Sequence, residues 1–135
     1  MPHVGSCYCG SVTIKVLSTH DVQYACHCED CKKTTGSAFS TCILPKISDV
    51  ESNGRIQTYD SKGPSGNIVT RMFCPKCGSA IAQKSITFGD NIVILTGNLP
   101  DFQTIPFGAE LFVRNRFTAL PPISGAEQAQ TLPSA

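Results

Sequence analysis

Tryptophan is absent from this chain, and aromatic residues make up only 7% of its 135 residues. Nine prolines and eleven glycines interrupt the sequence often, which excludes long helices. The length suits one domain with a buried core. Because few aromatic side chains are available to fill that core, we expect a small β-rich domain that gains part of its stability from bound metal.

The chain also lacks a basic excess, a secretory leader and a long apolar run. Its formal net charge is +1, and Lys32-Lys33 is the only adjacent basic pair, so nucleic acid is not an expected partner. Residues 1–5 have neither a basic start nor an apolar stretch. No segment approaches the ~20 apolar residues of a membrane span. These absences predict a cytoplasmic protein with no membrane or nucleic-acid partner.

Cysteine is what the chain has in quantity, and seven of its eight cysteines form three tight clusters. The clusters are Cys7 and Cys9, then Cys26, Cys28 and Cys31, then Cys74 and Cys77. Cysteines this close in sequence are poorly placed to form disulfides with one another, and no leader directs the chain to an oxidising compartment. Seven ligands divide into four and three, which predicts one closed zinc site and a second zinc site with an open position.

The closed site is expected to join the first cluster to the last. Cys74-Pro75-Lys76-Cys77 is typical of a zinc knuckle, and Gly78 after it can take a positive φ angle. A knuckle supplies two thiolates, so Cys7 and Cys9 are the expected donors of the other two. Zinc bound there would fasten the start of the chain to its middle and stabilise the fold directly.

The central cluster has the chemistry of a reactive site. Cys26, Cys28 and Cys31 lie within six residues, so one loop can place three sulfurs around one ion. The fourth position is then free for water or an incoming thiol, and a thiol bound to zinc is deprotonated. This arrangement is a route to an activated sulfur nucleophile at neutral pH.

Other interpretations of the central cluster stay open from the sequence. His27, or His3 or His20 from elsewhere, could close the site as a fourth ligand, although His27 in an extended segment would point away from its neighbours. Iron and sulfide could replace zinc, but the spacing matches neither common ferredoxin pattern. Cys42 lies in an apolar stretch and is expected to be a small buried hydrophobe.

The remaining sequence predicts short strands, one helical turn and a flexible end. Alternation of polar and apolar residues, or a short apolar run, predicts strands over residues 11–16, 39–44, 55–59, 68–73, 80–83, 91–96 and 109–114. A helical turn is expected over residues 30–35. We predict one domain over residues 1–123 and a flexible tail over residues 124–135, where Gly, Ala, Gln and Ser follow Pro121-Pro122.

Three motifs carry a resemblance to a known family. They read Gly5-Ser6-Cys7-Tyr8-Cys9-Gly10-Ser11-Val12, then Cys26-His27-Cys28-Glu29-Asp30-Cys31-Lys32-Lys33-Thr34-Thr35-Gly36-Ser37, then Phe73-Cys74-Pro75-Lys76-Cys77-Gly78-Ser79. Together they resemble the glutathione-dependent formaldehyde-activating enzyme family, which shares its domain with centromere protein V. The resemblance extends over roughly residues 3–122, which is most of the chain.

The resemblance implies a mainly β, single-domain β-tent fold of antiparallel sheets with zinc knuckles. It implies a structural zinc on Cys7, Cys9, Cys74 and Cys77, and a catalytic zinc on Cys26, Cys28 and Cys31. The implied activity is that of a carbon–sulfur lyase, which forms or cleaves S-hydroxymethylglutathione from glutathione and formaldehyde. Family members usually carry a Trp shortly after the segment that matches residues 110–116, where this chain has Phe117, so the lip of the pocket is expected to differ.

Five further residues are candidates for contact with a thiol such as glutathione. Thr35, Gly36 and Ser37 follow Cys31 and could meet a substrate carboxylate, or they could simply end the helical turn. Arg71 and Arg116 could pair with the two carboxylates of a glutathione-like tripeptide, or they could be exposed strand residues.

We hypothesise that the zinc at the central cluster lowers the pKa of the thiol, whose thiolate then attacks an electrophilic carbon. One alternative is an enzyme of secondary metabolism that uses the same zinc site on another small molecule. A second alternative is a non-catalytic zinc module that binds a protein partner. A monomer or a homodimer fits the sequence equally well.

Overall fold

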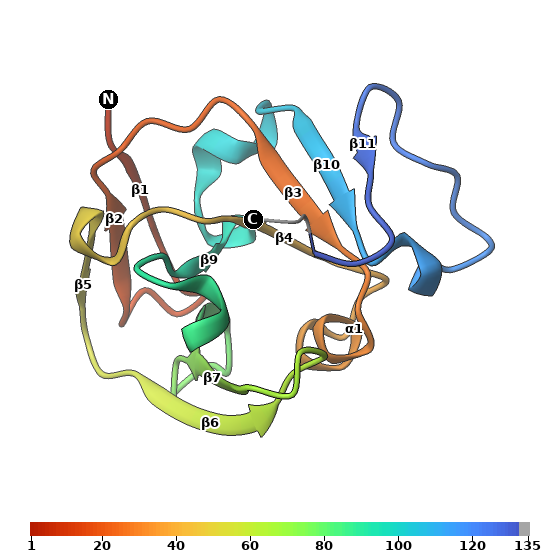
Figure 1. The fold of residues 1–135 in the computed structure, drawn as a ribbon. Coiled ribbons are helices and arrows are strands. Elements are labelled where there is room, and N and C mark those ends of the chain that lie inside the picture. The colour runs from red at the N-terminus through yellow and green to blue at the C-terminus, as the bar shows by residue number, and fades with distance from the viewer. Residues whose placement is uncertain (133–135) are drawn as a thin grey trace.

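The computed structural model describes residues 1–132, whose strands form two sheets (Figure 1). The smaller sheet has the order β1 (His3–Ser6), β2 (Thr13–Val16), β5 (Val50–Asn53). The larger sheet has the order β11 (Glu127–Gln128), β10 (Phe107–Leu111), β3 (Gln23–Cys26), β4 (Ser40–Ile43), β9 (Val93–Leu95), β8 (Ala80–Lys84), β7 (Ile68–Phe73), β6 (Gln57–Lys62). The prediction of a mainly β, single-domain protein is confirmed.

Helical structure is scarce in the described residues. The α-helix, α1, extends over Glu29–Thr35, and short 3-10 turns occupy Ile47–Asp49, Ile86–Phe88, Thr96–Asn98, Pro100–Gln103 and Val113–Asn115. Within residues 1–132, no helix is long and apolar enough to cross a membrane.

The main core lies where the two sheets face each other. In β2 the burial alternates along Thr13-Ile14-Lys15-Val16, with Ile14 and Val16 almost fully buried. From the larger sheet they meet buried side chains of β4, β8 and β9, which are Ile43, Ile81, Ala82 and Ile94. The period-two pattern predicted for residues 11–16 therefore marks the contact between the sheets.

Register divides the larger sheet into a core face and an opposite face. Across the antiparallel ladders, Ile43 lies beside Ile94 and Ile94 lies beside Ala82, and all three belong to the core cluster. In β4 and β9 their sequence neighbours Cys42, Val93 and Leu95 form a separate cluster on the other face, because successive side chains of a strand alternate between faces. That opposite face is the one that carries the site described below.

Helix α1 begins and ends where its sequence requires. The N-cap is Cys28, whose sulfur accepts the N–H of Cys31 at 3.3 Å, and the acidic residues Glu29 and Asp30 occupy the first turn. Gly36 ends the helix with a left-handed φ of 64°. The helical turn predicted over residues 30–35 is thus confirmed, and its first turn is built around two of the clustered cysteines.

The strand predictions held where patterning was strong. The strand predicted over residues 68–73 has those bounds as β7, and the one predicted over 80–83 is β8. The prediction over 109–114 was wrong beyond Leu111, because Phe112 takes a left-handed φ of 56° and the chain continues as a 3-10 turn. Strands β1, β3, β5 and β11 were not predicted from the sequence.

The C-terminal segment adds an edge to the larger sheet. Strand β11 pairs in parallel with β10, which itself pairs in parallel with β3, whereas the other ladders are antiparallel. The amide N–H of Ala129 donates to the carbonyl of Glu110 at 2.9 Å, and the N–H of Val113 donates to the carbonyl of Ala129 at 3.0 Å. These contacts lie within residues 124–135, for which the sequence predicted a flexible tail. Residues 133–135 of that segment lie outside the described residues.

Candidate functional site

The first and last cysteine pairs meet in one cluster. Cys7 and Cys9 lie on the loop after β1, and Cys74 and Cys77 lie on the loop after β7. Sulfurs ~2.3 Å from a tetrahedral zinc ion stand roughly 3.8 Å from one another. The sulfurs of Cys7 and Cys9 are 3.7 Å apart, and those of Cys9 and Cys74 are 3.8 Å apart. The donor set therefore fits a closed tetrahedral metal site.

Two serines support the sulfurs of this outer cluster. The Ser11 hydroxyl lies 3.1 Å from the sulfur of Cys9 and 3.3 Å from that of Cys74. Hydrogen bonds from the Ser79 hydroxyl and amide lower the pKa of Cys77 to about 5. Hydroxyl donors at these positions favour the thiolate, which is the form that binds metal.

The second cluster brings Cys26, Cys28 and Cys31 together in the interior. Cys26 ends β3, Cys28 caps α1, and Cys31 lies in its first turn. All three side chains are buried, and their sulfurs lie within 4.8 Å of one another. The thiols of Cys26 and Cys28 donate to Cys31 and lower its pKa, and the same interactions raise the pKa of Cys26.

These opposite shifts have one cause. Three buried sulfurs at this separation cannot all ionise, because like charges repel strongly away from water. A bound cation removes that obstacle and allows all three to act as thiolates. Three soft sulfur donors fit zinc, so the site suits the metal that the family resemblance implies.

Within residues 1–132, no histidine or carboxylate joins the three cysteines as a fourth ligand. The nearest histidine in sequence, His27, is turned away from the sulfurs, and its Nε2 lies 2.7 Å from Glu110. His3 interacts with Asp101 at 3.0 Å and accepts the amide N–H of His20. The arrangement therefore leaves one coordination position to the adjoining space.

Glu110 and His27 form a buried pair behind the cluster. Each side chain is only 1% exposed, and Glu110 also accepts from Gln128 at 2.7 Å, the amide of Ile123 at 2.8 Å and Arg116 at 3.3 Å. Burial alone would raise the pKa of Glu110, but these hydrogen bonds and the charge of Arg116 lower it to about 2. The pair thus joins β10 to the segment between Cys26 and Cys28.

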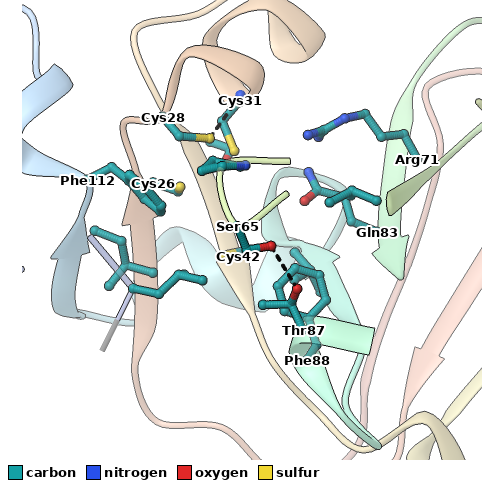
Figure 2. Close-up of a pocket in the computed structure, with 16 residues that line it drawn as sticks. Cys26, Cys28, Cys31, Cys42, Ser65, Arg71, Gln83, Thr87, Phe88 and Phe112 are labelled. Carbon is teal, nitrogen blue, oxygen red and sulfur yellow. Dashed lines mark hydrogen bonds between the residues drawn. The ribbon is translucent and has the colours of Figure 1, made fainter. Parts of the chain in front are cut away.

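A cavity of about 80 Å³ opens beside the three cysteines (Figure 2). It is lined mostly by apolar side chains, together with the cluster and a few polar groups: Cys26, Cys28, Cys31, Ser40, Cys42, Pro64, Ser65, Val69, Arg71, Gln83, Thr87, Phe88, Val93, Leu111, Phe112 and Leu132. Pockets of this type bind small molecules, with the few polar groups setting their orientation. The cavity is therefore the space into which the cysteine cluster faces.

Arg71 and Gln83 reach into the cavity from the wall opposite the cluster, as Figure 2 shows. The Arg71 side chain is 11% exposed, and its Nη1 is buried without a hydrogen-bond partner in the described residues. Its Nη2 lies 3.7 Å from the carboxylate of Asp30. The positive charge of Arg71 also contributes to lowering the pKa of Cys31, after the larger effect of the Cys26 and Cys28 thiols.

Cys42 and Phe112 complete the cavity in different ways. Cys42 is buried, as its apolar neighbours led us to expect, and burial raises the pKa of its thiol to about 12. Phe112 is the one non-glycine residue of residues 1–132 with a positive φ. Holding a phenylalanine there costs roughly 1–3 kcal/mol, which is the kind of strain found at functional sites. Its side chain lines the cavity next to Cys26, as Figure 2 shows.

The other candidate residues lie outside this cavity. The Thr35 hydroxyl donates to the carbonyl of Cys31 at 2.6 Å, and Gly36 ends the helix. Thr35 and Ser37 line a separate, more open hollow of about 520 Å³. Arg116 contacts Glu110 and Gln128. Of the five, only Arg71 lines the cavity beside the three cysteines.

Sequence reasoning missed Gln83, Phe112 and Glu110. Gln83 is a buried polar residue inside a strand, and a buried amide needs a partner, which is the signal that could have identified it. Phe112 gave no signal, because its backbone conformation cannot be read from its residue type. Glu110 could have been suspected from its place inside an apolar strand.

The fold and the two cysteine clusters define a small, mainly β protein with two sites that could hold metal. A family model described as glutathione-dependent formaldehyde-activating enzyme matches residues 2–115, and the chain belongs to that family. A crystal structure of a protein from Rhodobacter sphaeroides has a similar fold, with a TM-score of 0.58 and 20% identity, covering 77% of this chain and 98% of that one. No curated protein matches the chain.

Proposed function

We propose that this protein is a zinc-dependent carbon–sulfur lyase that forms or cleaves the bond between a thiol sulfur and a carbonyl-derived carbon. By family, glutathione is the thiol and formaldehyde the reference carbonyl compound. The observation that carries the proposal is the juxtaposition of three buried cysteines, without a fourth protein ligand in the described residues, with a cavity of small-molecule size.

The proposed reaction balances without an oxidant or reductant. In the forward direction the S–C bond forms, the π pair of the carbonyl moves to its oxygen, and the thiol proton ends on that oxygen. The reverse reaction breaks the S–C bond and restores the thiol and the carbonyl. Zinc at the three cysteines would act as a Lewis acid that holds the substrate thiol as a thiolate at neutral pH.

The residues of the chain have separate tasks in this proposal. Cys26, Cys28 and Cys31 would hold the metal beside the cavity that they line. The apolar side chains around them exclude water, which strengthens each electrostatic interaction with the substrate. Glu110 and His27 fix the segment that carries two of the ligands.

The outer cluster has a structural task. Cys7, Cys9, Cys74 and Cys77 make a complete tetrahedral set, which leaves no position for a substrate. A second zinc bound there would fasten the loop after β1 to the loop after β7. The proposed holoprotein therefore contains two zinc ions, one structural and one catalytic.

The adjoining polar hollow suits a glutathione-like thiol. It has a volume of about 320 Å³ and shares Cys28, Pro64 and Phe112 with the smaller cavity. Lys62 and Arg114 line it along with Glu29 and Asp30, so both charge signs are present. Glutathione carries two carboxylates and one ammonium group, which such a surface complements.

The test compares Cys31→Ser with Cys74→Ser, with Cys42→Ala as the matched control. Zinc per chain is measured by elemental analysis, and exchange between formaldehyde and its glutathione adduct is measured by NMR against the spontaneous rate. We expect two zinc ions and accelerated exchange in the unsubstituted protein. Cys31→Ser should fold but lose the acceleration, Cys74→Ser should lose the fold, and Cys42→Ala should still bind two zinc ions. If both site variants fold and accelerate exchange equally, the assignment of the two clusters is wrong.

A further inference from the structure

Arg71 and Gln83 form a polar pair on the cavity face of the larger sheet. They are direct partners in the β7–β8 ladder, and Gln83 in turn lies beside Val93 of β9. Directly opposed residues of a ladder project from the same face, so the three side chains form a row. All three line the cavity. The row ends in a guanidinium and an amide that are aimed across the cavity at the cysteines (Figure 2).

In the described part of the protein the hydrogen-bonding capacity of Arg71 is not fully used. The buried Nη1 of Arg71 has no hydrogen bond, and Asp30 stands at 3.7 Å, beyond a normal hydrogen bond. Gln83 is 7% exposed, and its side chain lines the cavity beside Arg71. Unpaired buried donors are costly, and a group that supplies acceptor oxygens would satisfy both side chains at once.

The size and walls of the cavity restrict what can supply those oxygens. Its volume of about 80 Å³ is far below the ~300–1,000 Å³ of pockets that hold drug-sized ligands. Most of the other side chains that line the cavity are apolar, among them Val69 and Val93. A ligand that reaches from the cysteines to Arg71 is therefore short and carries a single anionic end.

We propose that the carbonyl substrate of this site is a short carbonyl acid, whose carboxylate binds Arg71 and Gln83 while its carbonyl carbon faces the three-cysteine cluster. The inference rests on the proposed lyase function and names its second substrate. Formaldehyde is uncharged and cannot form an ion pair with a guanidinium. A carboxylate can, because its two oxygens match the paired N–H donors of the Arg71 guanidinium.

The reaction keeps the balance given above. A thiol adds to the carbonyl carbon of the acid, the new S–C bond replaces the π bond, and the thiol proton passes to the former carbonyl oxygen. The carboxylate is unchanged throughout, so it serves only to orient the carbon. Fixing both ends of a short substrate places its carbonyl carbon beside the thiol sulfur. Holding the two reacting atoms in this orientation accelerates the reaction.

The test compares glyoxylate with formaldehyde as the partner of glutathione in the zinc-loaded protein. NMR exchange measures kcat/KM for each carbonyl compound, after subtraction of its spontaneous rate. The measurement is made on the unsubstituted protein, on Arg71→Gln and on Arg55→Gln. Arg55→Gln is the control, because it removes the same charge from an exposed loop. We expect glyoxylate to be preferred. Arg71→Gln should lower the ratio of glyoxylate to formaldehyde kcat/KM by about 10- to 100-fold, and Arg55→Gln should leave it unchanged.

A second measurement requires no variant, so it stands even if Arg71→Gln fails to fold. Acetate should inhibit the exchange competitively, whereas acetamide, which has the same shape without the charge, should inhibit at least 10-fold more weakly. Turnover of formaldehyde without turnover of glyoxylate would overturn the inference and leave the proposed lyase function standing. Equal loss of both activities in Arg71→Gln would also overturn it, because the role of Arg71 would then not depend on the carboxylate. Failure to accelerate exchange with either compound would overturn the proposed function as well.

Discussion

Replacing Glu110 by Gln tests whether the buried pair behind the cysteine cluster stabilises the fold. The substitution keeps the shape of the side chain and removes the charge that accepts from His27, Gln128, Ile123 and Arg116. Lowering the pKa of Glu110 from 4.5 to about 2 corresponds to roughly 3 kcal/mol of stabilisation of the ionised form. Breaking a buried pair by changing one partner costs a similar ~3–5 kcal/mol. We therefore expect Glu110→Gln to lower the free energy of unfolding at pH 7 by about 3 kcal/mol.

The pH dependence supplies the decisive part of this prediction. Because the pKa of Glu110 is lower in the folded state, its stabilisation is fully present above the unfolded value of 4.5 and is lost as the pH falls toward about 2. Denaturant unfolding at several pH values between 7 and 3 should show the gap between the two proteins narrowing below about pH 4.5. The proteins would be compared at equal zinc content.

The control for this experiment is Glu127→Gln, which removes an exposed carboxylate from the neighbouring strand β11. It should change the free energy of unfolding by less than about 0.5 kcal/mol at every pH. The reasoning is refuted if Glu110→Gln is as stable as its parent at pH 7. The reasoning is also refuted if the difference in free energy of unfolding between Glu110→Gln and its parent stays constant down to pH 3. A loss of stability that does not depend on pH would come from packing and not from the ionised carboxylate.

Two further predictions concern other parts of the chain. A Cβ added at Gly5 in β1 would overlap the backbone carbonyl of Asn98, whereas one added at Gly97 would meet nothing within 4 Å. Gly5→Ala should therefore lower the free energy of unfolding by about 3 kcal/mol, and Gly97→Ala should lower it by less than about 1 kcal/mol. Chemical denaturation measures both changes. Burial raises the pKa of Cys42 to about 12, so iodoacetamide at pH 8 should not alkylate this thiol in the folded, zinc-loaded protein. Rapid labelling of Cys42, detected by mass spectrometry, would contradict its burial.

The sequence was most informative where the chemistry is local. One loop can bring cysteines this close in sequence around a single ion, so the grouping of Cys26, Cys28 and Cys31 was predicted from their spacing. Pairing the first cluster with the last needed one further step, because neither is a complete ligand set. The structure brings Cys7 and Cys9 to Cys74 and Cys77 as that count required.

The sequence was less informative where a position depends on long-range pairing. The candidate contacts Thr35 and Ser37 were chosen because they follow Cys31, yet Thr35 at the end of α1 and Ser37 just after it line a different hollow. Arg116 was chosen by its charge, and the structure places it beside Glu110. Neither outcome could be read from neighbours in sequence, since β10 reaches Cys26 only through its parallel pairing with β3.

The cavity itself is a consequence of strand register, and this explains why only the structure reveals it. In β9, Ile94 belongs to the core, while its neighbours Val93 and Leu95 belong to the opposite face with Cys42. Ile43 beside Ile94, and Ile94 beside Ala82, keep the apolar row of β4, β9 and β8 inside. The same register leaves Gln83, and with it Arg71, on the face of the cysteine cluster. A slip of one residue would exchange the two faces and place a guanidinium in the core, so the burial that stabilises the sheet also fixes which polar groups face the cavity.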